Sequence, residues 1–337
     1  MGFFKNLIMK EQDLKSIKKI NQIEELLEYI KVFYPNLNVN QNRIVNFENA
    51  LYNNYISLIG RILSYSPENM VMFLNDILVK FEIRNIKRII LNTILGKSKD
   101  TKRKQINYKA EVLLHHEEFF NKLLKLNTLD EILFHMEDTT YYKIIKEGLI
   151  YFRKNNEIFI LEAFLDRKFY DNLIQNTEYF SKKERDIIIP YINLLIEIYN
   201  LKIIFRSIRN GLDIELIKQL TIERFLILNS KDLGELISSE DQMGFKNLLS
   251  KVLRQNKELA PYFPEKNFIY DSLLKNVFQI YKNYYFNSLD VAIDDFDART
   301  ILGIIELIMK KEFEINHAIM PSIIRILHKK FRILKNN

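Results

Sequence analysis

Apolar residues recur along nearly the whole chain at the three- and four-residue spacing of amphipathic helices. In one clear example the apolar stripe consists of Leu201, Ile204, Phe205, Ile208 and Leu212. The opposite face of that helix carries the cations Lys202, Arg206 and Arg209. Convincing period-two alternation, which would indicate strands, is missing. The pattern therefore predicts an all-α fold.

The same spacing places helices along most of the chain and leaves few breaks. We expect helices over residues 12–33, 43–64, 68–96, 107–125, 129–136, 139–154, 157–175, 181–210, 214–220, 231–237, 241–255, 267–287 and 316–334. A further stripe of four isoleucines over residues 301–308 predicts a helix that ends near Lys310 and Lys311. Turn-like connectors are predicted at residues 34–38, 96–105, 155–156 and 261–264.

An internal repeat is the most informative feature of the sequence. Residues 82–96 and 197–211 share six of fifteen positions, whereas chance at this composition would give about one. The identical pairs are Glu82 and Glu197, Ile83 and Ile198, Asn85 and Asn200, Lys87 and Lys202, Ile89 and Ile204, and Gly96 and Gly211. A degenerate third copy is placed at residues 294–310. The repeat predicts three helical domains, over residues 1–112, 113–225 and 226–337.

These residues carry a family resemblance. A Glu-x-x-Asn-[Leu/Ile]-Lys element followed by an apolar helix and a glycine, twice at this offset, resembles the C/d central-stalk subunits of V/A-type rotary ATPases. Residues 161–170 (LEAFLDRKFY) are similar to that family's E-x-x-L-D-R-x-[FY]-[YF] segment, and residues 139–142 (TTYY) resemble its Thr-x-Tyr element. The resemblance is clearest over residues 80–235.

The resemblance implies a function as well as a fold. It implies a funnel-like array of three similar helical domains about a pseudo-threefold axis. It implies a non-catalytic rotor subunit, one copy per complex, that links the central axle (D/F-type subunits) to the membrane proteolipid ring. Such a subunit transmits torque for proton or sodium transport coupled to ATP synthesis or hydrolysis. It lies at the cytoplasmic face of the membrane and is attached peripherally, through the ring.

The composition agrees with a helical globular protein and excludes several other classes of protein and of site. Only eight glycines and six prolines interrupt 337 residues, so tight turns are few. The absence of cysteine excludes disulfides, thiolate catalysis and cysteine-ligated metals. No signal peptide is evident, and the longest charge-free runs, residues 50–60 and 187–196, fall short of the roughly 18 residues that a membrane span needs. We therefore expect no direct membrane span.

The repeated polar residues are the candidate contact and structural residues. Glu82 and Glu197 have no evident carboxylate or histidine partner for acid–base catalysis, and a Glu and an Asn three apart on one helix face favour hydrogen bonds to a neighbouring element. No glycine-rich phosphate loop accompanies the cations, because Leu91 stands where the first glycine of a P-loop would belong. The candidate set is Glu82, Asn85, Lys87, Glu197, Asn200, Lys202, Arg206 and Arg209.

Other polar clusters favour ordinary structural roles. His115 and His116 are adjacent, so on one helix their rings would face different ways, and no HExxH element is present. The basic residues within 97–104 are typical of a solvated loop. The tyrosines near residue 284 are typical of packing rather than of a base-stacking surface. No catalytic residue, cofactor or metal is predicted, and nucleic acid is not among the expected partners.

Three alternatives stay open from the residues alone. A generic helical scaffold would repeat every 34–47 residues, which the offset of 115 disfavours. A basic nucleic-acid-binding helical protein is compatible with the formal charge of +7. An enzyme with an unrecognised site would need a deep pocket that holds charged groups with shifted pKa values.

Overall fold

The computed structural model describes residues 8–35, 37, 44–259, 273–289 and 296–335, without the side chains of 273–275, 296 and 329–335. Every regular element in these ranges is helical, and they contain no strand, which confirms the all-α prediction. The chain divides into two compact units. Unit 1 comprises Met1–Tyr142 with Leu302–Asn337, and unit 2 comprises Lys143–Ile301.

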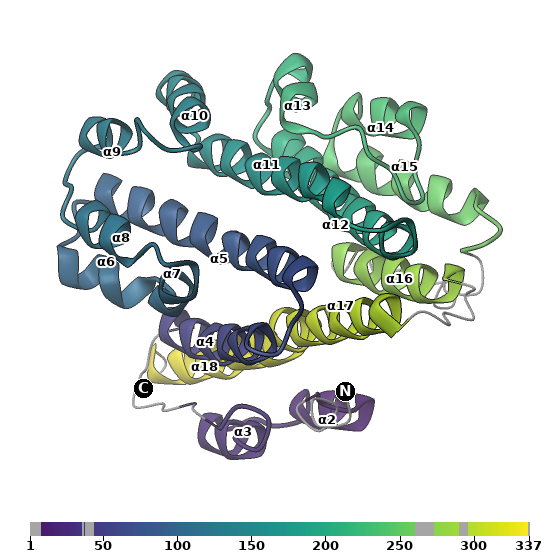
Figure 1. Ribbon diagram of the computed structural model, residues 1–337, viewed down its shortest axis with the longest axis horizontal. Helices are drawn as coiled ribbons and strands as arrows, with labels where there is room; N and C mark the ends of the chain where they lie inside the picture. The colour runs from purple at the N-terminus through teal and green to yellow at the C-terminus, as the bar shows by residue number, and fades with distance from the viewer. Residues whose placement is uncertain (1–7, 36, 38–43, 260–272, 290–295, 336–337) are drawn as a thin grey trace. The chain divides into compact units, whose positions relative to one another are not determined.

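Unit 1 is built around two long helices, α4 (Ile44–Leu63) and α5 (Glu68–Ile94), which pack on each other and on α7 (Figure 1). Its shorter helices are α2 (Glu11–Ile17), α3 (Ile23–Ile30), α6 (Lys99–Gln105), α7 (Tyr108–Leu114), α8 (Glu117–Leu123) and α9 (Leu129–His135). The core contains apolar side chains from both long helices, among them the fully buried Leu51, Leu74 and Ile86.

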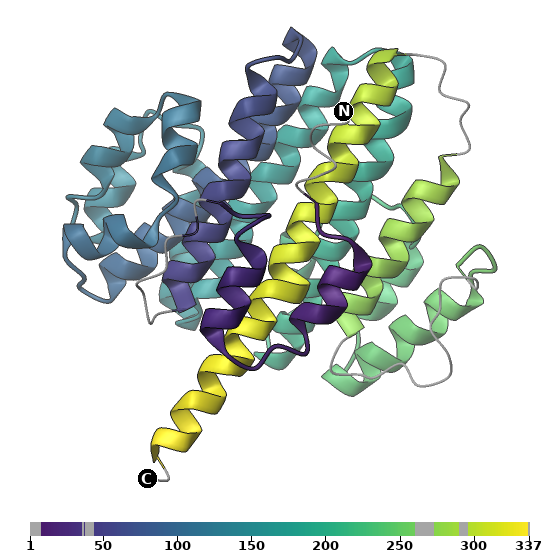
Figure 2. The ribbon, with the colours of Figure 1, turned by 90° about the horizontal axis from the view of Figure 1, so that it is seen from below.

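The end of the chain returns to unit 1. Helix α17 (Phe296–Glu314) continues through a π-helical turn, η4 (Ile315–Ile319), into α18 (Met320–Lys335). Helix α3 packs on α18 and α2 packs on η4, so the N-terminal helices lie against the C-terminal ones (Figure 2). The predicted helix end near Lys310 is therefore wrong. The prediction assumed that the lysines are solvated cations at a helix C-terminus. Instead, Lys311 is 2% exposed and pairs with Glu314 inside the protein.

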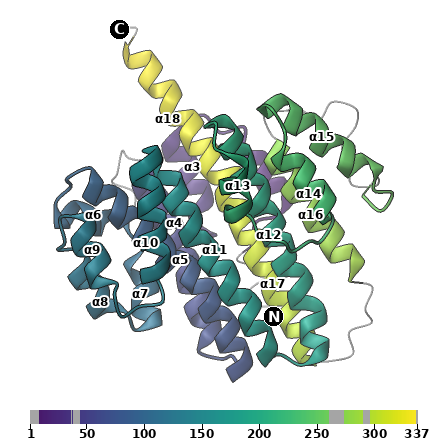
Figure 3. The same cartoon turned by 90° about the horizontal axis from the view of Figure 1, so that it is seen from above.

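Unit 2 is organised around α12 (Lys182–Arg209), which packs on α11 (Ile158–Asn176) and α13 (Ile214–Leu220) (Figure 3). Its other elements are α10 (Tyr142–Asn155), the 3₁₀ turn η1 (Thr177–Tyr179), α14 (Ser230–Ile237), α15 (Gln242–Gln255) and α16 (Leu273–Ser288). Among the described residues, α12 alone is long and apolar enough to cross a membrane. Its apolar window is 72% buried inside the protein, which is typical of a core helix.

Helices recur at the predicted offset. Helix α6 begins and ends 115 residues before α13, and α5 ends 115 residues before α12. Both long helices close on a glycine with positive φ, 62° at Gly96 and 63° at Gly211. In each case the next residue's N–H donates back into the last turn, Lys97 to Asn92 at 2.9 Å and Leu212 to Ser207 at 3.0 Å. Glycine suits this left-handed cap because it has no Cβ to clash.

The sequence pattern misplaced several boundaries. The helix predicted over 12–33 is two helices, α2 and α3, and the one predicted over 107–125 breaks at His115, whose φ is 61°. The connector predicted at 96–105 contains α6. Residues 38, 261–264, 267–272 and 294–295 lie outside the described ranges, so predictions there are untested. The three-domain division and the third repeat copy stay predictions.

Candidate functional site

The repeated residues occupy equivalent places on α5 and α12. Glu82, Asn85, Glu197 and Asn200 are all buried, with exposed fractions of 3% or less. The cations of the set point outward: Lys87 is half-buried, and Lys202, Arg206 and Arg209 are exposed. The carboxylate and the amide share one helix face because they lie three residues apart. Each long helix therefore presents its Glu–Asn pair to the interior of its own unit.

Each asparagine clamps the backbone of one residue, and the clamped residue lies 22 positions further on in both copies. Asn85 Nδ2 donates to the carbonyl of Asn107 (3.1 Å) and Oδ1 accepts the N–H of Asn107 (2.8 Å). Asn200 makes the same pair of bonds with Ile222, at 2.7 and 3.0 Å. An amide side chain satisfies a buried N–H and C=O together, which fixes the chain after the short helix against the long one.

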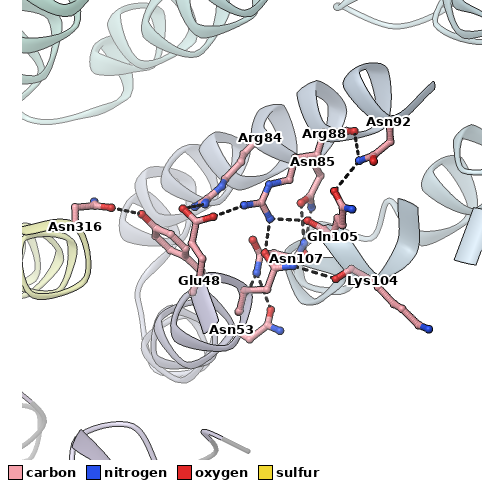
Figure 4. Close-up of polar contacts among 12 residues, drawn as sticks. Glu48, Asn53, Arg84, Asn85, Arg88, Asn92, Lys104, Gln105, Asn107 and Asn316 are labelled. Atoms are coloured by element: carbon pink, nitrogen blue, oxygen red, sulfur yellow. Dashed lines mark hydrogen bonds and ion pairs between the residues drawn. The ribbon is translucent and has the colours of Figure 1, made fainter. Parts of the chain in front are cut away.

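Further polar side chains extend the clamp of unit 1 (Figure 4). Asn107 Nδ2 donates to the carbonyl of Asn49 and to Asn53 Oδ1, both at 3.1 Å. The carboxylate of Glu48 in α4 forms ion pairs with two arginines of α5: Oε1 lies 2.5 Å from Arg84 Nη2, and Oε2 lies 2.6 Å from Arg88 Nη2. Burial and the neighbouring Arg84 lower the pKa of Arg88 to about 10. The network joins α4, α5 and the segment between α6 and α7.

Glu197 in unit 2 is held by the backbone. Its Oε1 accepts the N–H groups of Leu226, Ile227 and Leu228 at 2.7–2.8 Å. Burial raises the pKa of Glu197 to about 6, and these three donors oppose the rise. Glu197 thus fixes an extended segment between α13 and α14.

The raised pKa of Glu197 predicts a pH-dependent stability difference. Since the folded protein holds the proton up to about pH 6 and the ordinary pKa is 4.5, wild-type stability should fall as pH rises through this window. Glu197→Gln removes the titration, so the variant should gain about 1–3 kcal/mol relative to wild type between pH 4 and pH 7. Urea unfolding of both proteins at several pH values measures this difference. A difference that stays constant with pH would contradict the assignment.

Glu82 has side-chain partners instead. Tyr141 donates its hydroxyl to Oε1 (2.6 Å), and His116 Nδ1 lies 2.5 Å from Oε2. The predicted hydrogen bonding to neighbouring elements is confirmed for both glutamates. The expectation that Glu82 has no histidine or carboxylate partner is wrong, because His116 and Glu111 lie beside it. The expectation that His115 and His116 sit on one helix is also wrong. His115 directly follows α7, and His116 directly precedes α8. The only sequence signal for this pairing is the TTYY segment that supplies Tyr141.

The exposed ends of the two long helices differ in chemistry. Arg206 lies 3.6 Å from Glu162 and 4.7 Å above the ring of Phe159, and Arg209 ends α12, where cations suit the helix dipole. The equivalent positions of α5 are Leu91 and Ile94, which are 38% and 40% exposed. Unit 1 therefore shows an apolar helix end and unit 2 a basic one. One predicted solvated cation is instead buried: Lys102 is 1% exposed and bonds to the carbonyl of Leu126.

These contacts define a helical protein in which repeated polar residues hold long helices to the backbone beside them. The sequence model of the ATP synthase (C/AC39) subunit family matches residues 2–319, and the chain belongs to this family. The family consists of structural subunits rather than catalytic ones, so the chain is a non-enzymatic rotary-ATPase subunit.

Curated relatives agree with the family. The chain is 29% identical over 198 residues to the C subunit of the A-type ATP synthase of Methanocaldococcus jannaschii, which is 58% of this chain and 48% of the relative. It is 24% identical over 222 residues to the protein of the same name from Methanosphaera stadtmanae (65% and 56%) and 24% identical over 237 residues to that of Methanothermobacter thermautotrophicus (70% and 60%). The chain thus spans about half to three fifths of the length of these relatives.

Proposed function

We propose that the chain is the rotor subunit that joins the central axle of an A-type ATP synthase to its membrane proteolipid ring. The observation that carries the proposal is the family match over residues 2–319, together with relatives named as C subunits of A-type ATP synthases. On this view the axle is of the D/F type, one copy serves each complex, and the protein sits peripherally at the cytoplasmic face of the membrane. It passes torque during ATP-coupled proton or sodium transport.

The helix contacts support a torque-transmitting role. A part that transmits torque needs stiffness, which dense helix packing and buried hydrogen bonds supply. The capped ends of α5 and α12 and their asparagine clamps hold both helices firmly within their own units. We also propose that the repeat extends to three domains in a funnel-like array with a pseudo-threefold axis. Residues 1–112, 113–225 and 226–337 are their bounds.

A pull-down from gently solubilised host membranes tests the proposal. The tagged chain should recover the proteolipid ring, the axle subunits and the catalytic subunits, identified by mass spectrometry. Recovery of none of them, from an extract in which the assembled ATPase is demonstrably intact, would refute the rotor role. Steeply salt-dependent recovery of nucleic acid instead would favour the alternative of a basic nucleic-acid-binding protein.

The basic end of α12 gives a sharper variant of this experiment. Arg206 and Arg209 are exposed and would meet an acidic partner surface by charge complementarity. We expect Arg206→Glu/Arg209→Glu to reduce the recovery of partner subunits roughly tenfold, because reversed charges repel such a surface. The matched control is Lys218→Glu/Lys231→Glu, which makes the same charge change at exposed helix positions of the same unit. Equal recovery with both variants would show that the basic end is not a contact.

A further inference from the structure

Three metal-ligating side chains of unit 1 converge below α5. Glu82 comes from α5, Glu111 from α7 and His116 from the start of α8. One ligand atom from each lies within 4.8 Å of the other two. The two glutamates are buried, and the imidazole of His116 is 48% exposed, so the cluster has an approach from solvent through the histidine.

A left-handed turn between α7 and α8 brings these groups together. His115 adopts φ 61°, and the N–H of His116 donates to the carbonyl of Glu111 at 2.9 Å. This turn reverses the chain, so the side chain of His116 faces Glu82 while that of Glu111 comes from the preceding helix. The backbone turn therefore places Glu111 and His116 close to Glu82.

One carboxylate oxygen in the cluster has no hydrogen-bond partner. Glu111 is fully buried; its Oε1 accepts Asn85 Nδ2 at 2.5 Å, and its Oε2 has no partner. Two carboxyl groups in one buried space are costly unless a proton or a cation lies between them.

The second copy of the repeat shows that the cluster is particular to unit 1. Glu197, the counterpart of Glu82, satisfies Oε1 with three backbone N–H groups. The first of these belongs to Leu226, which stands 115 residues after Glu111, and Lys231 stands 115 residues after His116. Unit 1 thus has a second carboxylate and an imidazole where unit 2 has a backbone donor and a lysine.

We propose that Glu82, Glu111 and His116 bind one divalent transition-metal cation, with Zn²⁺ as the ion that fits best. Zinc takes histidine nitrogen and carboxylate oxygen as ligands, and sites with three protein ligands leave a fourth position for water. The imidazole disfavours magnesium and calcium, which prefer oxygen ligands throughout. Tyr141, which donates to Glu82, orients that ligand from outside the coordination sphere. The bound ion cross-links α5, α7 and α8.

Calorimetric titration of zinc sulfate into the full-length, chelator-treated chain tests the proposal. Wild type should bind one Zn²⁺ saturably. Glu111→Gln, which keeps the side-chain shape, and His116→Ala should each weaken binding at least about tenfold. His328→Ala is the control: this exposed histidine of unit 1 lies outside the cluster and outside the turn that forms it, so its loss should leave the affinity unchanged.

Thermal unfolding supplies a second readout that does not depend on the heat of binding. Zinc at about ten times the wild-type Kd should raise the Tm of wild type and of His328→Ala clearly more than that of Glu111→Gln. If His116→Ala does not fold, Glu111→Gln alone decides the question. The proposal is overturned if wild type shows no saturable site, if a folded cluster variant binds as wild type does, or if His328→Ala loses as much affinity as His116→Ala.

Discussion

Replacing Glu314 by alanine should lower the free energy of unfolding by about 3–5 kcal/mol, because it leaves a buried charge without its partner. Glu314 is 1% exposed and accepts Lys311 Nζ at 2.9 Å, the Tyr34 hydroxyl at 2.9 Å and the N–H of Met9 at 2.7 Å. Burial raises the pKa of Glu314 and lowers that of Lys311, and their mutual attraction opposes both shifts. Urea unfolding followed by circular dichroism measures the loss.

Two further variants separate the buried pair from a general effect of charge removal. Glu306→Ala breaks the i,i+4 pair with Lys310 on the same helix, and that pair is partly exposed, so its loss should stay within about 0.5 kcal/mol. Lys311→Met/Glu314→Leu removes both buried charges together and should cost much less than Glu314→Ala alone. A loss at Glu314 no larger than that at Glu306 would contradict the assigned role.

The Glu314 cluster also explains how unit 1 closes. Met9 and Tyr34 belong to the N-terminal part of the chain, and Glu314 ends α17 just before the π-helical turn η4. Tyr52 of α4 donates to Asn316 within that turn at 2.7 Å. The irregular turn thus carries contacts to segments more than 250 residues away in sequence. Helical periodicity could not reveal this, because the spacing of Lys311 and Glu314 is equally typical of a solvated pair.

Periodicity predicted the long helices well because their apolar stripes are long. The predictions for α4, α5, α11 and α12 came within two residues of the observed bounds. Helix α6 was missed because its sequence, KDTKRKQ, has no apolar position from which a stripe could be read. It forms because Ser98 caps its first turn and Lys102 is held beneath it by a backbone carbonyl. Such short helices depend on tertiary contacts more than on propensity.

The candidate site was predicted in part, for a similar reason. The three-residue spacing of Glu82 and Asn85 indicated hydrogen bonds to another element, since both fall on one helix face. Their partners could not be identified, because His116 and Tyr141 lie 34 and 59 residues away from Glu82. Glu111 and His116 meet Glu82 only through the left-handed turn at His115. Positive φ is uncommon outside glycine, so the sequence pattern favoured an unbroken helix there.

The asparagine clamps give the second large effect, and they test the repeat itself. Asn85→Ala and Asn200→Ala should each cost about 2–4 kcal/mol, since each leaves one backbone N–H and one C=O buried without a partner. Asn210→Ala is the control: this exposed residue follows α12, and its side chain donates to Glu157 at 3.2 Å, so its loss should stay below about 0.5 kcal/mol. Urea unfolding of the three variants measures the differences.

The two asparagine variants together test whether the repeated segments have the same structural role. If the repeat is structural, both alanine variants lose stability to a similar extent, because both remove the same pair of bonds at the same offset of 22 residues. Asn85 should lose somewhat more, since its Nδ2 also donates to the buried Glu111. A large loss of stability at one asparagine with almost none at the other would mean that the two similar sequences do not have the same structural role. The repeat would then reflect common ancestry alone.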